Sequence, residues 1–371
     1  MPKIRVLIVD DSVVIRKLLT DCLQADPDIE VAGTAANGQI ALSKITQINP
    51  DLVTLDVEMP FMDGHQTVAA IRKTHPRLPI IMFSTLTEHG ADATFRALSL
   101  GANDFVTKPS NVGSVGAAME QIRLELLPRI KNLCRREPIA KPATTGGASA
   151  CAAPVDRPRG VDVLAIGVST GGPNALAALL PELAVNFPVP IVIVQHMPPL
   201  FTRLLADRLG AACKCPAHEG RAGALLKAGE IWVAPGGLHM EVEKSPEGVR
   251  LRIHEGPPEN SCRPAVDVLF RSVASVYGGR VLAVVLTGMG QDGLRGCEFI
   301  REAGGMILAQ DEASSVVWGM PGAVSNAGLA EKILPLSELA AEINTRVFGA
   351  AAASSFATKN RPAQHALAKA L

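Results

Sequence analysis

The chain has 371 residues, which at roughly 100–200 residues per domain suggests two or three domains. Its 36 lysine and arginine residues balance 36 aspartate and glutamate residues, so a general nucleic-acid binder, which needs a basic excess, is disfavoured. Hydrophobic residues make up 47% and charged residues 19%, a composition that allows sizeable cores and argues against a largely disordered chain.

The sequence offers little support for secretion or membrane insertion. The first residues, MPKIRVLIVDDS, become acidic too soon after a short apolar run to form a signal peptide. The uncharged stretch Val163–Pro181 is interrupted by glycines and a proline, which makes it a poor membrane span. The seven cysteines form no C-x-x-C pair. We therefore expect a cytoplasmic protein with reduced thiols and no membrane insertion.

The first block of the chain alternates apolar strands with amphipathic helices, and we assign it to residues 1–134. The expected strands are Lys3–Asp10, Glu30–Ala36, Asp51–Asp56, Pro79–Ser84 and Asp104–Thr107. The expected helices are Ser12–Gln24, Gly38–Ile48, Gly64–Thr74, Asp92–Leu100 and Ser114–Cys134. Five repeats of this kind predict a doubly wound α/β domain with a parallel sheet, a flavodoxin-like arrangement.

The pattern then breaks and resumes. Residues 135–160 contain four prolines and a TTGGAS run, which is typical of a flexible linker. A second doubly wound, mainly parallel α/β domain is expected over residues 161–348, followed by an Ala-rich tail, 349–371, that we expect to be disordered. The expected strands of this second domain are Asp162–Gly167, Pro190–Gln195, Glu230–Ala234, Arg280–Thr287 and Gly305–Ala309, with a hairpin of His239–Glu243 and Gly248–His254. Its expected helices are Pro173–Leu183, Leu200–Leu209, Asp292–Ala303 and Leu336–Phe348.

Carboxylates end two strands of the first block. Asp10 and Asp11 follow the first strand and Asp56 ends the third, so the three should meet at the carboxyl edge of the parallel sheet. Such an oxygen-only cluster would suit Mg²⁺. Ser84 and Lys108 end the fourth strand and follow the fifth, where a hydroxyl and an ammonium suit a phosphoryl group on Asp56. Each residue alone is equally typical of an ordinary turn, but the combination predicts a site.

In these five residues the first block resembles the response-regulator receiver family, from residue 1 to about 130. The resemblance implies phosphoryl transfer from a partner histidine kinase to Asp56, with Mg²⁺ held by the three aspartates. Phe105 lies where that family usually has an aromatic switch residue, and it is equally typical of a half-buried strand aromatic.

A serine stands in a sharp turn at the start of the second block. Ser169 follows the apolar strand, in the string Gly-Val-Ser-Thr-Gly-Gly-Pro, which satisfies G-x-S-x-G. Gly171 and Gly172 allow a tight turn, and Pro173 suits the first position of a helix. This placement raises the serine at the sheet edge beside free backbone N–H groups. A helix-capping serine would give the same local pattern.

A histidine and an aspartate are expected at the same sheet edge. His196 follows the next apolar strand, and Asp292 follows the strand ending at Thr287, so both fit the base and the orienting carboxylate of a serine nucleophile. His239 is a competing base, and Asp292 is equally typical of a helix N-cap. Backbone N–H groups of Met289 and Thr170 are candidate donors to an oxyanion. The order serine, histidine, aspartate differs from that of an α/β-hydrolase.

The second block resembles the catalytic domain of chemotaxis protein-glutamate methylesterase over about residues 161–347. The strings that carry the resemblance are IGVSTGG, QHM, VAPGG, RPAVDVLF, LTGMGQDG, QDE and VWGMP. One departure is Cys262, where the family often has a basic or histidine residue. A receiver, a linker and an esterase are also that family's layout.

The resemblance implies a phosphorylation-regulated carboxylic ester hydrolase. Its substrates would be methylated glutamates on chemoreceptor cytoplasmic helices, with deamidation of receptor glutamines, and the hydrolysis would need no cofactor. An unphosphorylated receiver that covers the Ser169 edge is the regulatory hypothesis. Alternatives are a non-enzymatic docking domain or a target outside chemotaxis; a nucleic-acid-binding output is disfavoured because no basic helix-turn-helix is evident.

Overall fold

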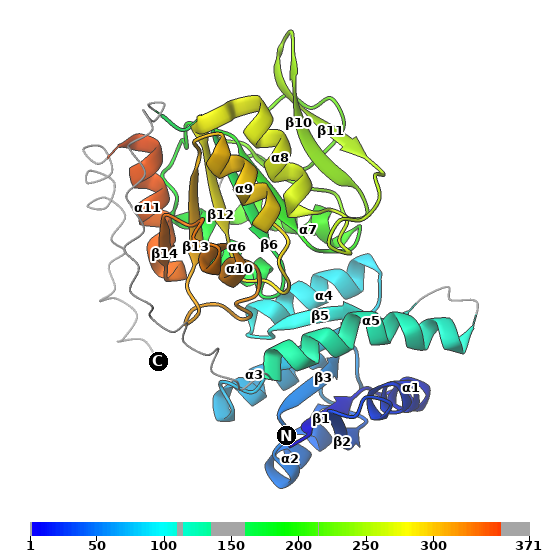
Figure 1. Ribbon diagram of the computed structural model, residues 1–371. Helices are drawn as coiled ribbons and strands as arrows, with labels where there is room; N and C mark the ends of the chain where they lie inside the picture. Colours follow the sequence, from blue (N-terminus) through cyan, green and yellow to red (C-terminus); the bar gives the residue numbers. More distant parts are fainter. Residues whose placement is uncertain (1, 110–113, 135–159, 214, 350–371) are drawn as a thin grey trace. The chain divides into compact units, whose positions relative to one another are not determined.

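The computed structural model describes residues 2–109, 114–134, 160–213 and 215–349 (Figure 1). Its contacts divide the chain into two compact units, with the boundary between residues 152 and 153. The predicted linker and the predicted tail lie outside the described residues except for Gly160 and Gly349, so the domain limits stay a prediction. Across the described ranges, every helix is too short or too polar to span a lipid bilayer.

The first unit is built on one parallel five-stranded sheet with the strand order β2-β1-β3-β4-β5. Its strands are β1 (Ile4–Val9), β2 (Ile29–Ala35), β3 (Leu52–Asp56), β4 (Ile80–Ser84) and β5 (Asp104–Thr107). Its helices are α1 (Val13–Gln24), α2 (Gly38–Ile48), α3 (Gly64–Thr74), α4 (Glu88–Ser99) and α5 (Val115–Cys134). Helices α1 and α5 pack together, and α3 packs against both α2 and α4. The strand order reverses beside β1, which is where ligands bind in such sheets.

The second unit contains a parallel seven-stranded sheet with the order β14-β13-β12-β6-β7-β9-β8. Its strands are β6 (Val163–Val168), β7 (Ile191–Gln195), β8 (Ala217–Glu219), β9 (Ile231–Val233), β12 (Val281–Val285), β13 (Met306–Gln310) and β14 (Lys332–Leu334). The central strands β6, β7 and β12 are buried along their whole length. Continuous apolar strands of this kind are expected where helices cover both faces of a sheet.

Helices and a hairpin surround this sheet. The helices are α6 (Gly172–Leu179), α7 (Phe201–Cys213), α8 (Val266–Tyr277), α9 (Leu294–Glu302), α10 (Met320–Asn326) and α11 (Leu336–Phe348), with short 3₁₀ turns η1 (Leu180–Glu182) and η2 (Gly278–Arg280). The antiparallel hairpin pairs β10 (His239–Ser245) with β11 (Gly248–His254). Figure 1 shows α8 beside α9 and next to this hairpin.

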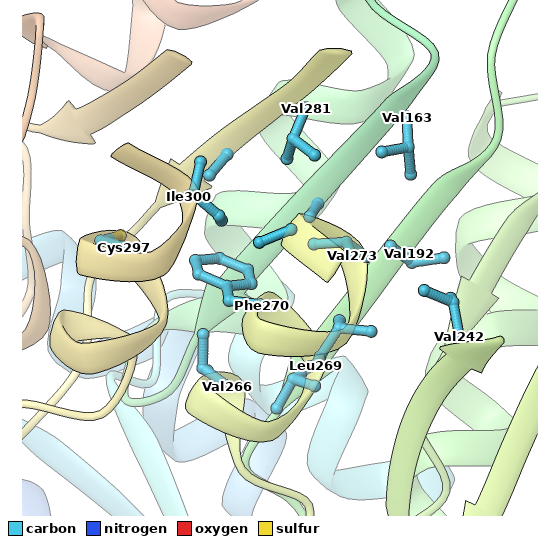
Figure 2. Close-up of a cluster of buried hydrophobic side chains, with 14 of the residues drawn as sticks. Val163, Val192, Val242, Val266, Leu269, Phe270, Val273, Val281, Cys297 and Ile300 are labelled. Carbon is cyan, nitrogen blue, oxygen red and sulfur yellow. The ribbon is translucent and has the colours of Figure 1, made fainter. Parts of the chain in front are cut away.

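Helix α8 lies at the centre of a large hydrophobic cluster of the second unit. Figure 2 shows its side chains Leu269, Phe270 and Val273 among residues of the sheet, of α9 and of the hairpin. All three are fully buried, and Val242 of β10 closes the cluster from the hairpin side. Because α8 contacts several elements at once, its position fixes where the residues just before it lie. Those residues reach the candidate site described below.

The predicted fold class of two mainly parallel α/β units is confirmed, with local corrections. Helix α4 begins at Glu88 and not at Asp92, because the Thr87 hydroxyl accepts the Gly90 N–H and caps the helix earlier. Helix α9 begins at Leu294 and not at Asp292. Sequence analysis did not predict four short or buried elements, which are β8, β14, α8 and α10.

Candidate functional site

The three aspartates of the first unit meet at the carboxyl edge of its sheet. Asp10 and Asp56 are almost fully buried after β1 and at the end of β3, whereas Asp11 is exposed. One carboxylate oxygen from each lies within 4.8 Å of the others. The Lys108 ammonium lies 2.9 Å from Asp10 Oδ2 and 2.8 Å from Asp56 Oδ2. One ammonium therefore faces three carboxylates, which leaves a net negative pocket.

This electrostatic imbalance appears in the acid–base behaviour of the pocket. Burial raises the pKa of Asp56 to about 6, and the Asp10 charge adds to that effect, while Lys108 opposes it. Burial lowers the pKa of Lys108, but its bonds to Asp56 and Asp10 outweigh burial and raise it overall. A hard divalent cation is the natural counter-charge for such an oxygen-only set, so these residues fit Mg²⁺.

Two residues predicted for this pocket are engaged elsewhere. The Ser84 side chain is fully buried, and its hydroxyl donates to the Gly90 carbonyl of α4 at 3.1 Å. Phe105 is buried on β5, with 7% of its surface exposed. The structure thus brings Lys108 to the carboxylates but leaves the proposed roles of Ser84 and Phe105 as predictions.

In the second unit, Ser169 lies in the turn between β6 and α6. Its backbone N–H donates to the Thr287 carbonyl at 3.0 Å, and its own carbonyl accepts the Gly172 N–H at 2.8 Å. Gly171 has a φ of 79°, in the left-handed region that favours glycine. A Cβ on Gly288 would lie 2.8 Å from Ser169 Cβ, so only glycine lets the β12 turn approach the serine this closely.

His196 lies beside this serine at the end of the neighbouring strand. Val168 of β6 is paired with Gln195 of β7, so Ser169 and His196 are the next residues on two adjacent strands. Adjacent strands lie about 4.8 Å apart. His196 Nε2 is 2.8 Å from Asp292 Oδ2. The predicted histidine and aspartate are thus hydrogen-bonded to each other, and the serine follows the adjoining strand.

The Asp292 carboxylate is held by a dense set of donors. It accepts the backbone N–H groups of Val266 (2.7 Å) and Asp267 (3.0 Å), the first residues of α8, and that of Gly293. Asp267 in turn accepts the N–H groups of Gly293 and Gly296 at the start of α9. Asp292 therefore caps α8, the helix that contains Asp267, and Asp267 caps α9, the helix that follows Asp292. Asp292 does not cap its own helix, which answers the alternative left open by the sequence.

A tight turn before α8 completes this network. Asn260 donates its side-chain N–H groups to Asp267 Oδ2 at 2.8 Å and to Asp292 Oδ1 at 3.0 Å. Gln195 donates from its buried amide to the Ser169 carbonyl at 2.9 Å. Cys262 Sγ lies 3.6 Å from His196 Nδ1. Sequence reasoning missed the first two residues, and it noted Cys262 only as a departure from the family.

The charges of this network are set by its hydrogen bonds. Burial raises the pKa of Asp292, but the bonds from His196 and from the backbone outweigh burial and hold the pKa below its ordinary value. Burial lowers the pKa of His196, but hydrogen bonds to Asp292 and Cys262 outweigh burial and raise it to about 9. Burial and the Asp292 charge keep the pKa of Asp267 raised. At neutral pH the resting pair is therefore imidazolium and carboxylate.

The competing histidine belongs to the framework. His239 is buried, its Nε2 donates to the Pro257 carbonyl at 3.0 Å, and its Nδ1 accepts the Ala265 N–H at 3.3 Å. With both ring nitrogens occupied, His239 is a poor candidate for a base.

The turn after β12 places Met289 directly after Gly288, which packs on Ser169, and Thr170 is buried. Their oxyanion roles stay predictions.

Comparison with known proteins gives this geometry a context. The family model described as CheB methylesterase matches residues 164–343, and the response regulator receiver domain model matches residues 6–120. Together they define a response regulator whose second domain is of the methylesterase class.

Many relatives match along almost the whole chain, and two of them serve as examples. The protein-glutamate methylesterase/protein-glutamine glutaminase of Trichodesmium erythraeum is 54% identical, over 94% of this chain and 100% of its own. The namesake from a Nocardioides species is 56% identical, over 94% of this chain and 96% of its own. This chain belongs to the protein-glutamate methylesterase/protein-glutamine glutaminase family. The solved Thermotoga maritima CheB methylesterase catalytic domain is 37% identical, covering 50% of this chain and 99% of its own with a TM-score of 0.49.

The raised pKa of His196 yields a direct prediction. We expect its ring to titrate near pH 9, observed as the shift of its ring carbons by NMR. Cys262→Ala should lower that midpoint because one of the two bonded partners is lost, while Cys213→Ala should leave it unchanged. Since the folded pKa lies above the unfolded one, the protonated ring stabilises the fold below about pH 6.5, and this is lost as pH rises through about 9. A wild-type midpoint near 6.5 would contradict the assignment.

Proposed function

We propose that this chain is a phosphorylation-regulated serine esterase that hydrolyses glutamate methyl esters on chemoreceptors and deamidates receptor glutamines. The observation that carries the proposal is the 2.8 Å bond between His196 and Asp292 at the strand end beside Ser169. The family supports the chemistry, because the relatives bear the names of both activities. The receptor substrate, the histidine kinase that donates the phosphoryl group and a cytoplasmic location are parts of the same proposal.

The proposed reaction assigns one task to each member of the triad. Because His196 Nε2 is hydrogen-bonded to Asp292, Nδ1 of the neutral ring is the nitrogen left to take the proton from Ser169 Oγ, so the ring must first lose the proton that it carries at neutral pH. The serine attacks the ester carbonyl, and the protonated ring returns the proton to the departing methanol. Water then cleaves the acyl-enzyme by the same route. A glutamine side chain would lose ammonia in place of methanol.

Two further features fit this reaction. Asp292 fixes the ring through Nε2 and stabilises its charge as the proton arrives. The backbone N–H groups of Met289 and Thr170 are the proposed donors to the oxyanion, which needs preorganised dipoles at that point. All of these groups belong to the chain itself, so we propose no cofactor for the hydrolysis.

The first unit supplies the proposed control. Asp56 is the proposed phosphoryl acceptor, and Lys108, already 2.8 Å from its carboxylate, would pair with the phosphoryl oxygens. Asp10, Asp11 and Asp56 would hold Mg²⁺, which when bound supplies neutralisation of the incoming negative charge. Ser84 and Phe105 keep their proposed switch roles. The Ser84 hydroxyl is bonded to the Gly90 carbonyl and the Phe105 ring is buried, so both side chains must move to respond to phosphorylation of Asp56.

Replacement of the proposed nucleophile tests the esterase directly. Ser169→Ala should reduce release of methanol from methylated receptor by several orders of magnitude while leaving the fold intact, because the acyl-enzyme cannot form. Ser325→Ala, whose hydroxyl bonds only within α10, is the matched control and should keep wild-type activity. Full activity of the Ser169 variant would show that the second unit is not a serine esterase and would favour a docking role.

Replacement of the proposed acceptor tests the control separately. Wild-type chain given Mg²⁺ and a small phosphodonor should become labelled and should demethylate receptor faster than without the donor. Asp56→Asn should abolish both the label and the stimulation, because the amide cannot accept the phosphoryl group. Asp21→Asn, an exposed carboxylate paired with Lys17, should behave as wild type. Stimulation that persists in Asp56→Asn would place the acceptor elsewhere.

A further inference from the structure

Cys262 lies on the Nδ1 side of the His196 ring, and the proposed reaction does not use it. Its sulfur lies 3.6 Å from Nδ1, whereas Asp292 occupies Nε2 at 2.8 Å. A ligand atom of each of these three residues lies within 4.8 Å of the others. Cys262 is partly exposed as a residue, unlike the buried Cys22 and Cys297. Cys262, His196 and Asp292 therefore form a second possible triad. It uses the same histidine and aspartate as the proposed triad of Ser169.

The position of this thiol is fixed by the surrounding structure. Glu259 and Cys262 exchange both backbone hydrogen bonds across a tight turn, at 3.1 and 2.9 Å. The two residues between them, Asn260 and Ser261, have φ values of 51° and 61°. Arg271 of α8 binds both oxygens of Glu259 at 2.6 Å. Because Asn260 also binds Asp292, the network that orients the histidine holds the thiol against it.

The chemistry of this contact differs from that of four other cysteines in the described ranges. A thiolate is the reactive form of cysteine, and an adjacent imidazolium stabilises it. Burial raises the pKa of Cys213, with Cys215 adding to the effect, to about 12, and burial also raises the pKa of Cys215. Cys22 and Cys297 are buried and have raised pKa values. The Cys262 sulfur instead lies 3.6 Å from the ionisable ring of His196.

We propose that Cys262 is a modification site: a thiol activated by His196 that hydroperoxides oxidise, and whose oxidation stops the esterase. When the ring is neutral, the thiol proton passes to His196 Nδ1, and the sulfur then attacks one peroxide oxygen. The sulfur–oxygen bond forms as the oxygen–oxygen bond breaks, and the leaving hydroxide takes the proton from the ring to become water. Sulfur is oxidised to a sulfenic acid, and hydrogen peroxide is reduced to water.

The effect on hydrolysis follows from which ring nitrogen is free. Ser169 needs Nδ1 of His196, and the new hydroxyl on sulfur would lie within reach of that nitrogen. It would bond to the ring and fill the space through which the serine proton must pass. A thiol reductant reverses the change, because one thiol displaces water from the sulfenic acid to form a mixed disulfide and a second thiol releases Cys262. This regulatory part rests on the proposed esterase, whereas the reactivity of the thiol does not.

The reactivity is tested without measuring hydrolysis. Full-length protein is treated with hydrogen peroxide near pH 7, sulfenic acids are trapped with a dimedone probe, and labelled peptides are quantified by mass spectrometry. We expect Cys262 to be trapped at least about tenfold faster than Cys213 and Cys215, which lie in the same unit. His196→Gln should remove most of that advantage and leave the other two cysteines unchanged. Equal rates at the three cysteines, or an unaltered Cys262 rate in His196→Gln, would overturn the proposal.

The switch is tested by activity on the same samples. Hydrolysis by wild type should fall in step with Cys262 trapping and return with dithiothreitol. Cys262→Ala, whatever its starting activity, should keep that activity in peroxide, whereas Cys213→Ala should lose it as wild type does. Fast trapping with unchanged hydrolysis would overturn the switch. Should Ser169→Ala hydrolyse esters as well as wild type, the proposed function would fail, and the trapping rates would still decide whether Cys262 is reactive.

Discussion

Five hydrogen bonds converge on the carboxylate of Asp292, from His196, Asn260 and three backbone N–H groups. Few arrangements could keep this charge ionised inside a protein, because an unpaired buried carboxylate takes up a proton. The donors come from the start of α8, from the turn before it, from the residue after β7 and from Gly293 just before α9. The carboxylate therefore ties the histidine to the core helix of the second unit, and removing it would leave several buried N–H groups unpaired at once.

The reciprocal caps explain how the site stays rigid. Asp292 caps α8, Asp267 caps α9, and both helices pack through the apolar cluster of Figure 2. The packing of α8 and α9 therefore also fixes the orientation of the His196 ring, because Asp292 is hydrogen-bonded to both α8 and His196. A site supported in this way loses little freedom when the substrate binds, which is the condition for electrostatic catalysis.

The same topological rule places both sites, and it made much of each predictable. Asp56, Ser169 and His196 end or follow parallel strands whose apolar runs are plain in the sequence, so their sheet edge follows from strand direction. Helix α8 was missed although VDVLFRSVASVY carries apolar residues at helical spacing, because its four valines are β-branched residues typical of a strand. The turn at Asn260 and Ser261 has positive φ values at two non-glycine residues, a conformation that composition does not reveal. The Ser84 hydroxyl donates to the Gly90 carbonyl of α4, a side-chain orientation that the strand pattern does not reveal.

The central claim, that Asp292 and His196 activate Ser169, is tested most directly by a fluorophosphonate probe, which labels only activated serines. The account predicts one adduct, located on Ser169 by peptide mass spectrometry, with a labelling rate that falls by about 10³-fold or more in Asp292→Asn because the ring loses its orienting charge. Circular dichroism on that variant would confirm that the fold persists. Labelling at another residue, or at an undiminished rate in a folded Asp292→Asn variant, would contradict the account.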